Sequence, residues 1–312
     1  MQALTNAVLP VFGIVLIGWL AARTRFMGEP AIDGLSRFVF NFAVPLLLFR
    51  SVARAGLPEH TPWGLLLAFY GAALAVLLLG FAAGRLLFGR GPMESVSYGA
   101  TAAYGNTVLM GIPIVLMTYG EVASLPLFVI MGVHTLVMVP MVSLAYAFAG
   151  GRGRGLKGAL GDMAGDLARN PILIALILGL LYARLAPPLP RVADEIARLL
   201  GETAMPAALF AIGGTLARYS IGGQVKHALM LSAAKLAVFP ALVWLLADRA
   251  LGLPDLWVQV AVLLAAMPCG VTAFLFATRY DAARATVTTS VVLSAALAVI
   301  TLPAAIWLTG GA

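Results

Sequence analysis

The chain has 312 residues, of which 62% are hydrophobic and 11% are charged, and its formal net charge is +7. A soluble protein has about 25% charged residues, so this composition excludes an ordinary water-soluble domain and indicates a membrane protein. The basic residues are scattered through short polar stretches rather than clustered, which argues against a nucleic-acid-binding protein.

Ten apolar windows follow one another along the chain, each bounded by charged residues, Gly or Pro. They are residues 4–22, 35–53, 63–87, 96–118, 124–147, 170–187, 197–217, 227–248, 256–277 and 284–309. Long apolar runs favour helices over the alternating segments of a β-barrel. No basic residue precedes the first window, so we interpret it as a span rather than a signal peptide. The sequence therefore predicts an all-α polytopic membrane protein with ten transmembrane helices.

The distribution of basic residues predicts the orientation of these spans. Most of the 20 Lys and Arg residues fall in the connections between spans 1 and 2, 3 and 4, 5 and 6, 7 and 8, and 9 and 10. The positive-inside rule places those connections in the cytoplasm. We therefore expect both termini outside and a multi-pass protein of the bacterial inner (plasma) membrane.

Matching prolines predict an internal duplication. Three prolines of the first half recur in corresponding spans of the second at a nearly constant offset: Pro45 with Pro206, Pro113 with Pro268, and Pro140 with Pro303. Five spans in each half give the two halves opposite orientations, and inverted repeats are common in secondary carriers. We expect residues 1–148 to form the first five-helix repeat, 149–169 a cytoplasmic linker, and 170–312 the second, inverted repeat.

Gly and Pro interrupt the fourth and ninth predicted spans near their middles. Unwound backbone in a membrane is tolerated where it lines a cavity, and a pair of broken helices points to a transporter site. The half-helix N-termini exposed there suit an anion. The predicted substrate-binding residues are Asn106, Thr107, Gly111, Pro113, Pro268, Cys269, Gly270 and Thr272. The alternative interpretation is that Gly and Pro only kink two packed helices.

Several segments resemble the auxin efflux carrier family, which includes the plant PIN-FORMED carriers. They are PVFGIVLIGWLAAR, FVFNFAVPLLLF, GNTVLMGIPIVL, MPAALFAIGGTLA, AAMPCGVTAFLFATRY and LPAAIWL, in this order along nearly the whole chain. The resemblance implies crossing broken helices 4 and 9, in a fold similar to bile-acid symporters and sodium–proton antiporters. It also implies a scaffold domain from spans 1, 2, 6 and 7, a transport domain from spans 3–5 and 8–10, and an elevator-type motion.

The resemblance further implies a small organic anion as substrate, a homodimer and no cofactor. Asn106 corresponds to the family's asparagine beside the first break. The plant carriers have a second asparagine in the other break, but here Cys269 and Gly270 follow Pro268. The predicted span 63–87 also lacks the acidic residue of the plant carriers. These departures argue against auxin itself as the substrate.

Three ionisable residues within the predicted spans are candidates for coupling transport to an ion, with proton coupling foremost. Lys235 lies deep in its span, where a charge is a functional candidate; alternatively it is a structural lysine bonded to broken-helix carbonyls. His134 titrates near neutral pH, or it is simply hydrogen-bonded within the bundle. Glu202 stands near a proline bend, and pairing with Arg198 one turn earlier is the simpler interpretation.

The remaining function classes receive little support. The chain has three His and one Cys, and no pattern of paired carboxylates, activated Ser or metal ligands, so we predict neither an enzyme nor a metal site. The prediction is a secondary active transporter of a small carboxylate, such as malate or malonate, or an auxin-like weak acid. A channel, or a membrane sensor that binds a metabolite without coupled transport, remains the alternative.

Overall fold

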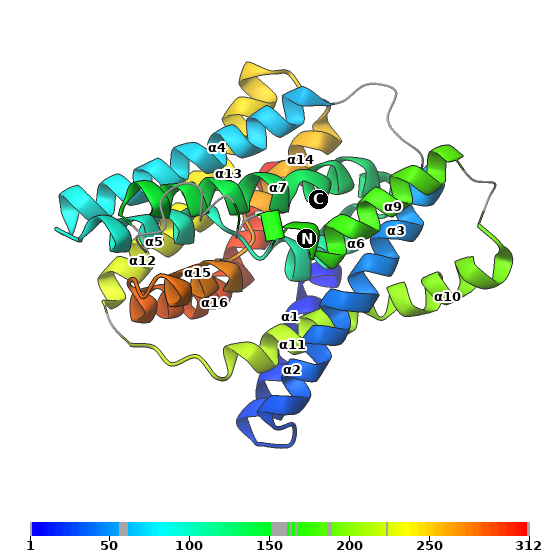
Figure 1. Cartoon of the computed structure of the whole chain (residues 1–312), viewed down its shortest axis with the longest axis horizontal. Helices are drawn as coiled ribbons and strands as arrows, with labels where there is room; N and C mark the ends of the chain where they lie inside the picture. The colour runs from blue at the N-terminus through cyan, green and yellow to red at the C-terminus, as the bar shows by residue number, and fades with distance from the viewer. Residues whose placement is uncertain are drawn as a thin grey trace. The chain divides into compact units, whose positions relative to one another are not determined.

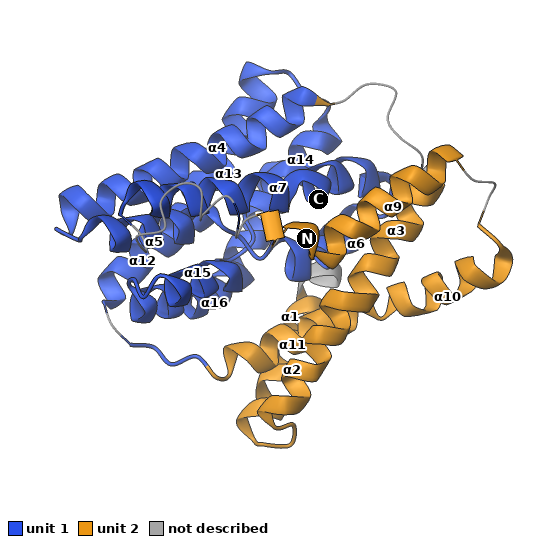
Figure 2. Ribbon diagram, viewed as in Figure 1, with its two compact units in different colours: residues 1–8, 63–163, 219–312 blue, residues 9–62, 164–218 orange. Residues whose placement is uncertain are grey.

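The computed structural model describes residues 2–55, 62–150, 161, 164–165, 167–185, 189–222 and 224–310. Within these ranges the secondary structure is helical apart from one isolated β-bridge (Figure 1). Most of the predicted linker 149–169 lies outside the described residues. The chain divides into two compact units, one of residues 1–8, 63–163 and 219–312, the other of residues 9–62 and 164–218 (Figure 2). We refer to them as unit 1 and unit 2.

Unit 2 is built from helices of the first and middle parts of the chain. They are α1 (Gln2–Arg23) from residue 9 on, α2 (Glu29–Phe38), the π-helical segment η1 (Val39–Ala43), α3 (Val44–Ala55), α9 (Pro171–Leu185), α10 (Arg191–Glu202) and α11 (Ala204–Leu216). Helix α3 packs on α9 and α10, and α11 packs on α2. Arg50 joins α3 to α10 through Asp194 at 2.9 Å. Small residues let helices approach closely in membranes. Gly213 of α11 does so against α1, because a Cβ on Gly213 would be 1.9 Å from the Val15 oxygen.

Unit 1 holds the two broken helices and the helices around them. Its first part comprises α4 (Trp63–Ala82), η2 (Ala83–Leu87), α5 (Pro92–Ala103), η3 (Thr107–Gly111), α6 (Ile112–Tyr119), η4 (Glu121–Ala123) and α7 (Ser124–Phe148). Its second part comprises α12 (Val225–Ala233), η5 (Ala234–Val238), α13 (Phe239–Trp244), η6 (Leu245–Ala250), α14 (Asp255–Ala265), α15 (Val271–Arg279) and α16 (Arg284–Leu308). Helix α4 packs on α5, α12 on α16, and α13 on α14.

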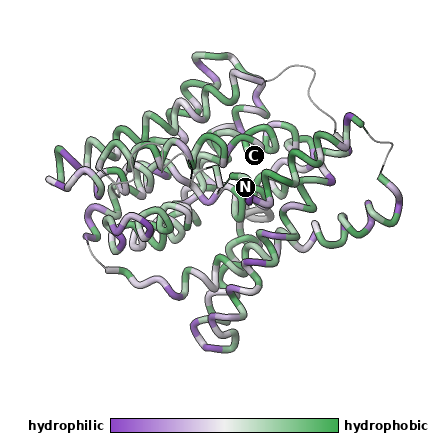
Figure 3. Tube along the Cα trace, in the orientation of Figure 1, coloured by the Kyte–Doolittle hydropathy of each residue, from purple (hydrophilic) through white to green (hydrophobic). Residues whose placement is uncertain are grey.

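Ten apolar helical stretches contain most of the described helices, with α5 and α15 outside them, and their lengths fall into two groups. Six are long and apolar enough to cross a membrane: Glu29–Arg54, Trp63–Leu87, Glu121–Phe148, Arg191–Leu216, Val225–Ala250 and Arg284–Leu308. Four are shorter: Leu9–Arg23, Thr107–Tyr119, Pro171–Leu185 and Asp255–Ala265. Figure 3 shows hydrophobic residues predominating along α4 and α7. These findings confirm a helical, multi-pass membrane protein, whereas the count of ten spans in two inverted repeats stays a prediction.

Both expected interruptions are present, and the first is shorter than the Gly and Pro pattern predicts. The first covers residues 104–106 between α5 and η3, and the second covers 266–270 between α14 and α15. Gly111 and Pro113 lie beyond the first interruption, within the continuous helix formed by η3 and α6. Gly111 instead permits close packing, because a Cβ there would be 2.8 Å from Leu264 Cδ2.

Several prolines follow π-helical segments. Pro45, Pro113 and Pro240 come just after η1, η3 and η5 respectively. Proline has no N–H to offer the carbonyl of the preceding turn, and a π-helical turn is one way in which a helix adjusts locally to such a disruption. These prolines therefore widen their helices without interrupting them. In η5 this widened turn carries Lys235.

Candidate functional site

The two interruptions cross as an antiparallel bridge between Gly105 and Cys269. The Asn106 N–H donates to the Pro268 oxygen at 2.8 Å, and the Gly270 N–H donates to the Tyr104 oxygen at 2.8 Å. A Cβ built on Gly270 would lie 2.7 Å from the Gly105 oxygen, so only glycine at position 270 allows the two interrupted segments to come this close. We call residues 104–107 and 266–272 the crossover.

Four helix ends meet the crossover. Helices α5 and α14 end there, whereas η3 with α6 and α15 begin there. The first N–H groups of a helix have no partner within the helix, and the helix dipole adds partial positive charge at that end. Two helix beginnings thus offer hydrogen-bond donors to an anion, while the two helix ends offer carbonyl oxygens to a cation.

Asn106 and Thr272 are the polar side chains at the two helix beginnings that remain open to a ligand. Both are half-buried, and within the described part of the chain neither side chain has a hydrogen-bond partner. Thr107 is more enclosed, since only 2% of its surface is exposed. Pro268, Cys269 and Gly270 are buried and supply backbone rather than side-chain groups.

Lys235 reaches the crossover from η5 and is fully buried. Its Nζ donates a hydrogen bond to the Ala265 oxygen, at the end of α14. It also lies 4.7 Å from the centre of the Phe239 ring, and a Cβ on Gly105 would be 3.0 Å from Nζ. The bond to a broken-helix carbonyl is the contact that the structural interpretation of Lys235 predicts, and the same position puts a positive charge beside the crossover.

His134 approaches the same region from α7. Its Nε2 is 3.1 Å from the Thr107 hydroxyl, and its Nδ1 is buried without a hydrogen-bond partner among the described residues. The rings of Tyr70 and Tyr104 pack around it, with centroid distances of 6.1 and 5.6 Å. Thr107 therefore links His134 to the helix that begins at the crossover.

Glu202 belongs to unit 2 and lies at the end of α10. Arg198 donates to its carboxylate at 2.6 Å and also binds Glu195. This is the ion pair that the simpler interpretation of Glu202 predicts. The structure thus brings Lys235 and His134 to the crossover within unit 1, whereas Glu202 belongs to unit 2.

Ser294 is a site residue that the sequence did not single out. Its hydroxyl, fully buried on α16, accepts a hydrogen bond of 2.9 Å from the Cys269 N–H. It thereby satisfies a backbone donor that the interruption leaves without a helical partner. A serine in a long apolar helix is equally typical of helix–helix contacts, so the sequence alone offered no signal that would distinguish it.

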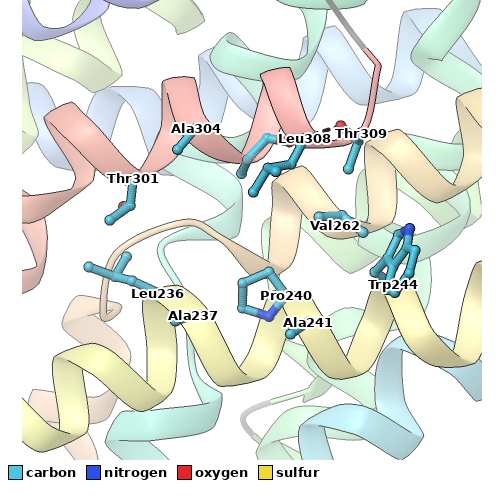
Figure 4. Close-up of a pocket in the computed structure, with 11 residues that line it drawn as sticks. Leu236, Ala237, Pro240, Ala241, Trp244, Val262, Thr301, Ala304, Leu308 and Thr309 are labelled. Atoms are coloured by element: carbon cyan, nitrogen blue, oxygen red, sulfur yellow. Dashed lines mark hydrogen bonds between the residues drawn. The ribbon is translucent and has the colours of Figure 1, made fainter.

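An apolar pocket of about 480 Å³ lies elsewhere on unit 1. Figure 4 shows α16 on one side, with Thr301, Ala304 and Leu308, facing Pro240 and Trp244 on the other. Its lining has no charged side chain, so it is poorly suited to a carboxylate.

Among the described residues, no group of three His, Cys, Asp or Glu side chains is placed to hold a metal ion.

Crossed broken helices with open donors are typical of secondary transporters, and comparison with known proteins decides the family. The family described as "Membrane transport protein" matches residues 3–157 and 162–307. The chain belongs to this family, which includes the auxin efflux carriers. The match confirms the resemblance noted in the sequence. The family and the names of its members indicate a membrane transporter rather than an enzyme.

Three relatives from bacteria and a plant match this chain over nearly its whole length. A protein of Rhizobium meliloti named "Putative malonate transporter" is 30% identical, and the match covers 99% of this chain and 96% of that one. "Auxin efflux carrier component 8" of Arabidopsis thaliana is 24% identical, covering 94% of each chain. "Uncharacterized transporter YfdV" of Escherichia coli strain K12 is 23% identical over 95% of this chain and 94% of that one.

Proposed function

We propose that this family member is a secondary active transporter of a small organic anion that binds at the crossover. The observation that carries the proposal is the meeting of two helix beginnings with the open side chains of Asn106 and Thr272. Backbone donors and partial positive charge favour a carboxylate at such a position. The buried side-chain amine of Lys235 lies beside it and adds a positive charge when it is protonated.

The substrate class that this arrangement favours is a small mono- or dicarboxylate, such as malonate, malate or an auxin-like weak acid. The relative named "Putative malonate transporter" supports a dicarboxylate, because that match covers nearly the whole chain. The proposal includes the bacterial inner membrane as location, with both termini outside, since the basic residues follow the positive-inside rule. A homodimer, implied by the family resemblance, is part of it and is tested by the mass of the purified protein.

The proposed mechanism is an elevator-type alternating access, in which unit 1 carries the substrate against unit 2. The division of the chain into two compact units, with the crossover contained in one of them, supports this mechanism. Proton coupling through His134 or Lys235 is the proposed source of energy. Uptake into proteoliposomes that follows an imposed pH gradient supports it, and uptake that is identical without the gradient contradicts it.

Binding of carboxylates to the purified protein is the decisive test of the site. We would measure the melting temperature with a panel of mono- and dicarboxylates, with and without sodium, for the wild type and Asn106→Ala. The substitution leaves the backbone bond from residue 106 to Pro268 in place. Thr118→Ala is the matched control, because the Thr118 hydroxyl bonds to the Ile114 oxygen of its own helix and to no other described residue.

The expected result is that one carboxylate stabilises the wild type and Thr118→Ala but does not stabilise Asn106→Ala. Stabilisation that is equal in all three proteins would place the anion away from Asn106 and contradict the proposed site. Binding at Asn106 without any uptake would favour a sensor instead of a transporter.

A further inference from the structure

Unit 2 contains a second pocket, of about 540 Å³, between the end of α1, the loop that leads to α2, and the end of α11. Three arginines line it, Arg23, Arg25 and Arg218, against one carboxylate, Glu29. Its volume is in the range of small-ligand sites. The pocket is therefore large enough for a polar group of several atoms and is predominantly positive.

Two of the three arginines have no carboxylate partner in the described ranges. Arg218 is held in place, since it donates to Asp33 Oδ1 at 2.8 Å and to the Glu29 backbone oxygen at 3.0 Å. Arg23 and Arg25 are exposed, and among the described residues no ion pair or side-chain hydrogen bond engages either guanidinium group. The pocket thus presents two unneutralised guanidinium groups beside a third that is fixed.

The backbone holds Arg25 in an unusual conformation at this pocket. Its φ is +61°, and the Met27 N–H donates to the Ala21 oxygen at 2.9 Å. The Arg25 N–H donates to the Ala22 oxygen at 3.1 Å, a bond typical of helix endings in which glycine usually takes the left-handed position. An arginine at that position costs conformational energy, and its side chain lines a pocket.

Charge and location together favour a phosphate-bearing ligand from the membrane. Guanidinium groups match the geometry of phosphate oxygens and bind them by paired hydrogen bonds. Both chain segments that form the pocket belong to connections that the positive-inside rule assigns to the cytoplasm, where the membrane leaflet carries anionic lipids. The neighbouring Phe26 is 88% exposed, and an apolar ring so exposed is more favourable among acyl chains than in water.

We propose that this pocket binds the phosphate group of an anionic phospholipid, with Arg23, Arg25 and Arg218 as its donors. The site belongs to unit 2 and does not depend on the carboxylate proposed at the crossover of unit 1. A lipid bound here would tie the α1–α2 connection to the cytoplasmic membrane surface.

The test compares three full-length proteins purified in a non-ionic detergent: the wild type, Arg23→Gln/Arg25→Gln, and the matched control Arg184→Gln/Arg191→Gln. The control removes two exposed arginines of the same unit that lie outside the pocket. Arg218 is left intact because it binds Asp33. Melting temperature is measured against increasing dioctanoyl-phosphatidylglycerol, dioctanoyl-phosphatidylcholine and inorganic phosphate.

We expect phosphatidylglycerol to stabilise the wild type and the control at the same concentration. For Arg23→Gln/Arg25→Gln that concentration should rise about 30-fold, because each of the two basic side chains near an anionic lipid surface contributes about fivefold to affinity. Inorganic phosphate that reproduces the whole effect would support the phosphate site but overturn the lipid as its occupant. Equal responses in all three proteins, or equal responses to phosphatidylglycerol and phosphatidylcholine, would overturn the proposal.

Discussion

The Nε2 atom of His134 lies 3.1 Å from the Thr107 hydroxyl, on the first residue of the helix that begins at the crossover. The other ring nitrogen is buried and has no described hydrogen-bond partner. A proton bound there would add a positive charge close to the proposed anion site. Proton and anion would then favour each other's binding, which is the relationship that a coupled transporter requires.

The first prediction concerns His134→Gln. The amide can still bond the Thr107 hydroxyl, but it cannot titrate between pH 5 and 8. A bound anion favours a proton on His134, so carboxylate binding to the wild type should take up a proton, whereas binding to His134→Gln should take up less. Isothermal titration calorimetry in buffers of different ionisation enthalpy measures this uptake. His227→Gln is the control, since His227 bonds Tyr98 instead; equal proton uptake by the wild type and His134→Gln would exclude His134 as the group that binds the proton.

The second prediction separates the two interpretations of Lys235. Lys235→Met keeps most of the apolar stem but removes the ammonium group that bonds the Ala265 oxygen. If the charge serves the substrate, carboxylate affinity should fall about tenfold or more, the effect expected for loss of a close charge pair. Lys226→Met removes an exposed charge early in α12 and should bind normally. Normal affinity in the fraction of Lys235→Met that folds, together with poor assembly, would show Lys235 to be structural.

The third prediction tests the close approach at the crossover. Gly270→Ala would place a Cβ 2.7 Å from the Gly105 oxygen, so the bridge must open. We expect loss of transport and a lower melting temperature, because two buried backbone hydrogen bonds depend on that spacing. Gly71→Ala is the control, as its nearest neighbour would be 3.9 Å away, an ordinary contact. Equal transport by the two variants would mean that the bridge is dispensable.

The fourth prediction concerns Ser294→Ala, which leaves the buried Cys269 N–H without its acceptor. An unsatisfied buried donor costs about 1–3 kcal/mol, so the melting temperature should fall clearly. Ser290→Ala on the same helix should be nearly neutral, because within the described part of the chain the Ser290 hydroxyl bonds only the Thr286 oxygen one turn earlier. An equal fall in melting temperature in both variants would show that Ser294 contributes packing and not a hydrogen bond to the Cys269 N–H.

The sequence could predict where the helices break, because Pro268, Gly270 and Gly105 disfavour continuous helix in apolar spans. It could not predict how far each break extends. Pro113 looks like a helix breaker, yet the π-helical turn of η3 just before it keeps the helix continuous through Gly111. Gly111 in this helix packs against Leu264 of a distant helix, and no local sequence pattern predicts that contact.

The sequence likewise predicts some residues of the candidate site and not others. Asn106 and Lys235 stand out in the sequence because polar and charged groups are rare in membrane helices. Ser294 and the ring of Tyr104 do not, because serine and tyrosine are ordinary in such helices. Only the fold brings Ser294 of α16 to the Cys269 N–H, and Tyr104, just after α5, to the His134 ring.

The contact between Gly105 and Gly270 also bears on how this protein can evolve. A side chain on residue 270 would meet the Gly105 backbone of the other break, whereas a side chain on residue 105 would meet the Lys235 side chain 3.0 Å away. Position 270 can therefore change only if the other break moves, and position 105 can change only if the side chain at position 235 gives way. Across related sequences, a larger residue at position 105 should accompany a shorter one at position 235.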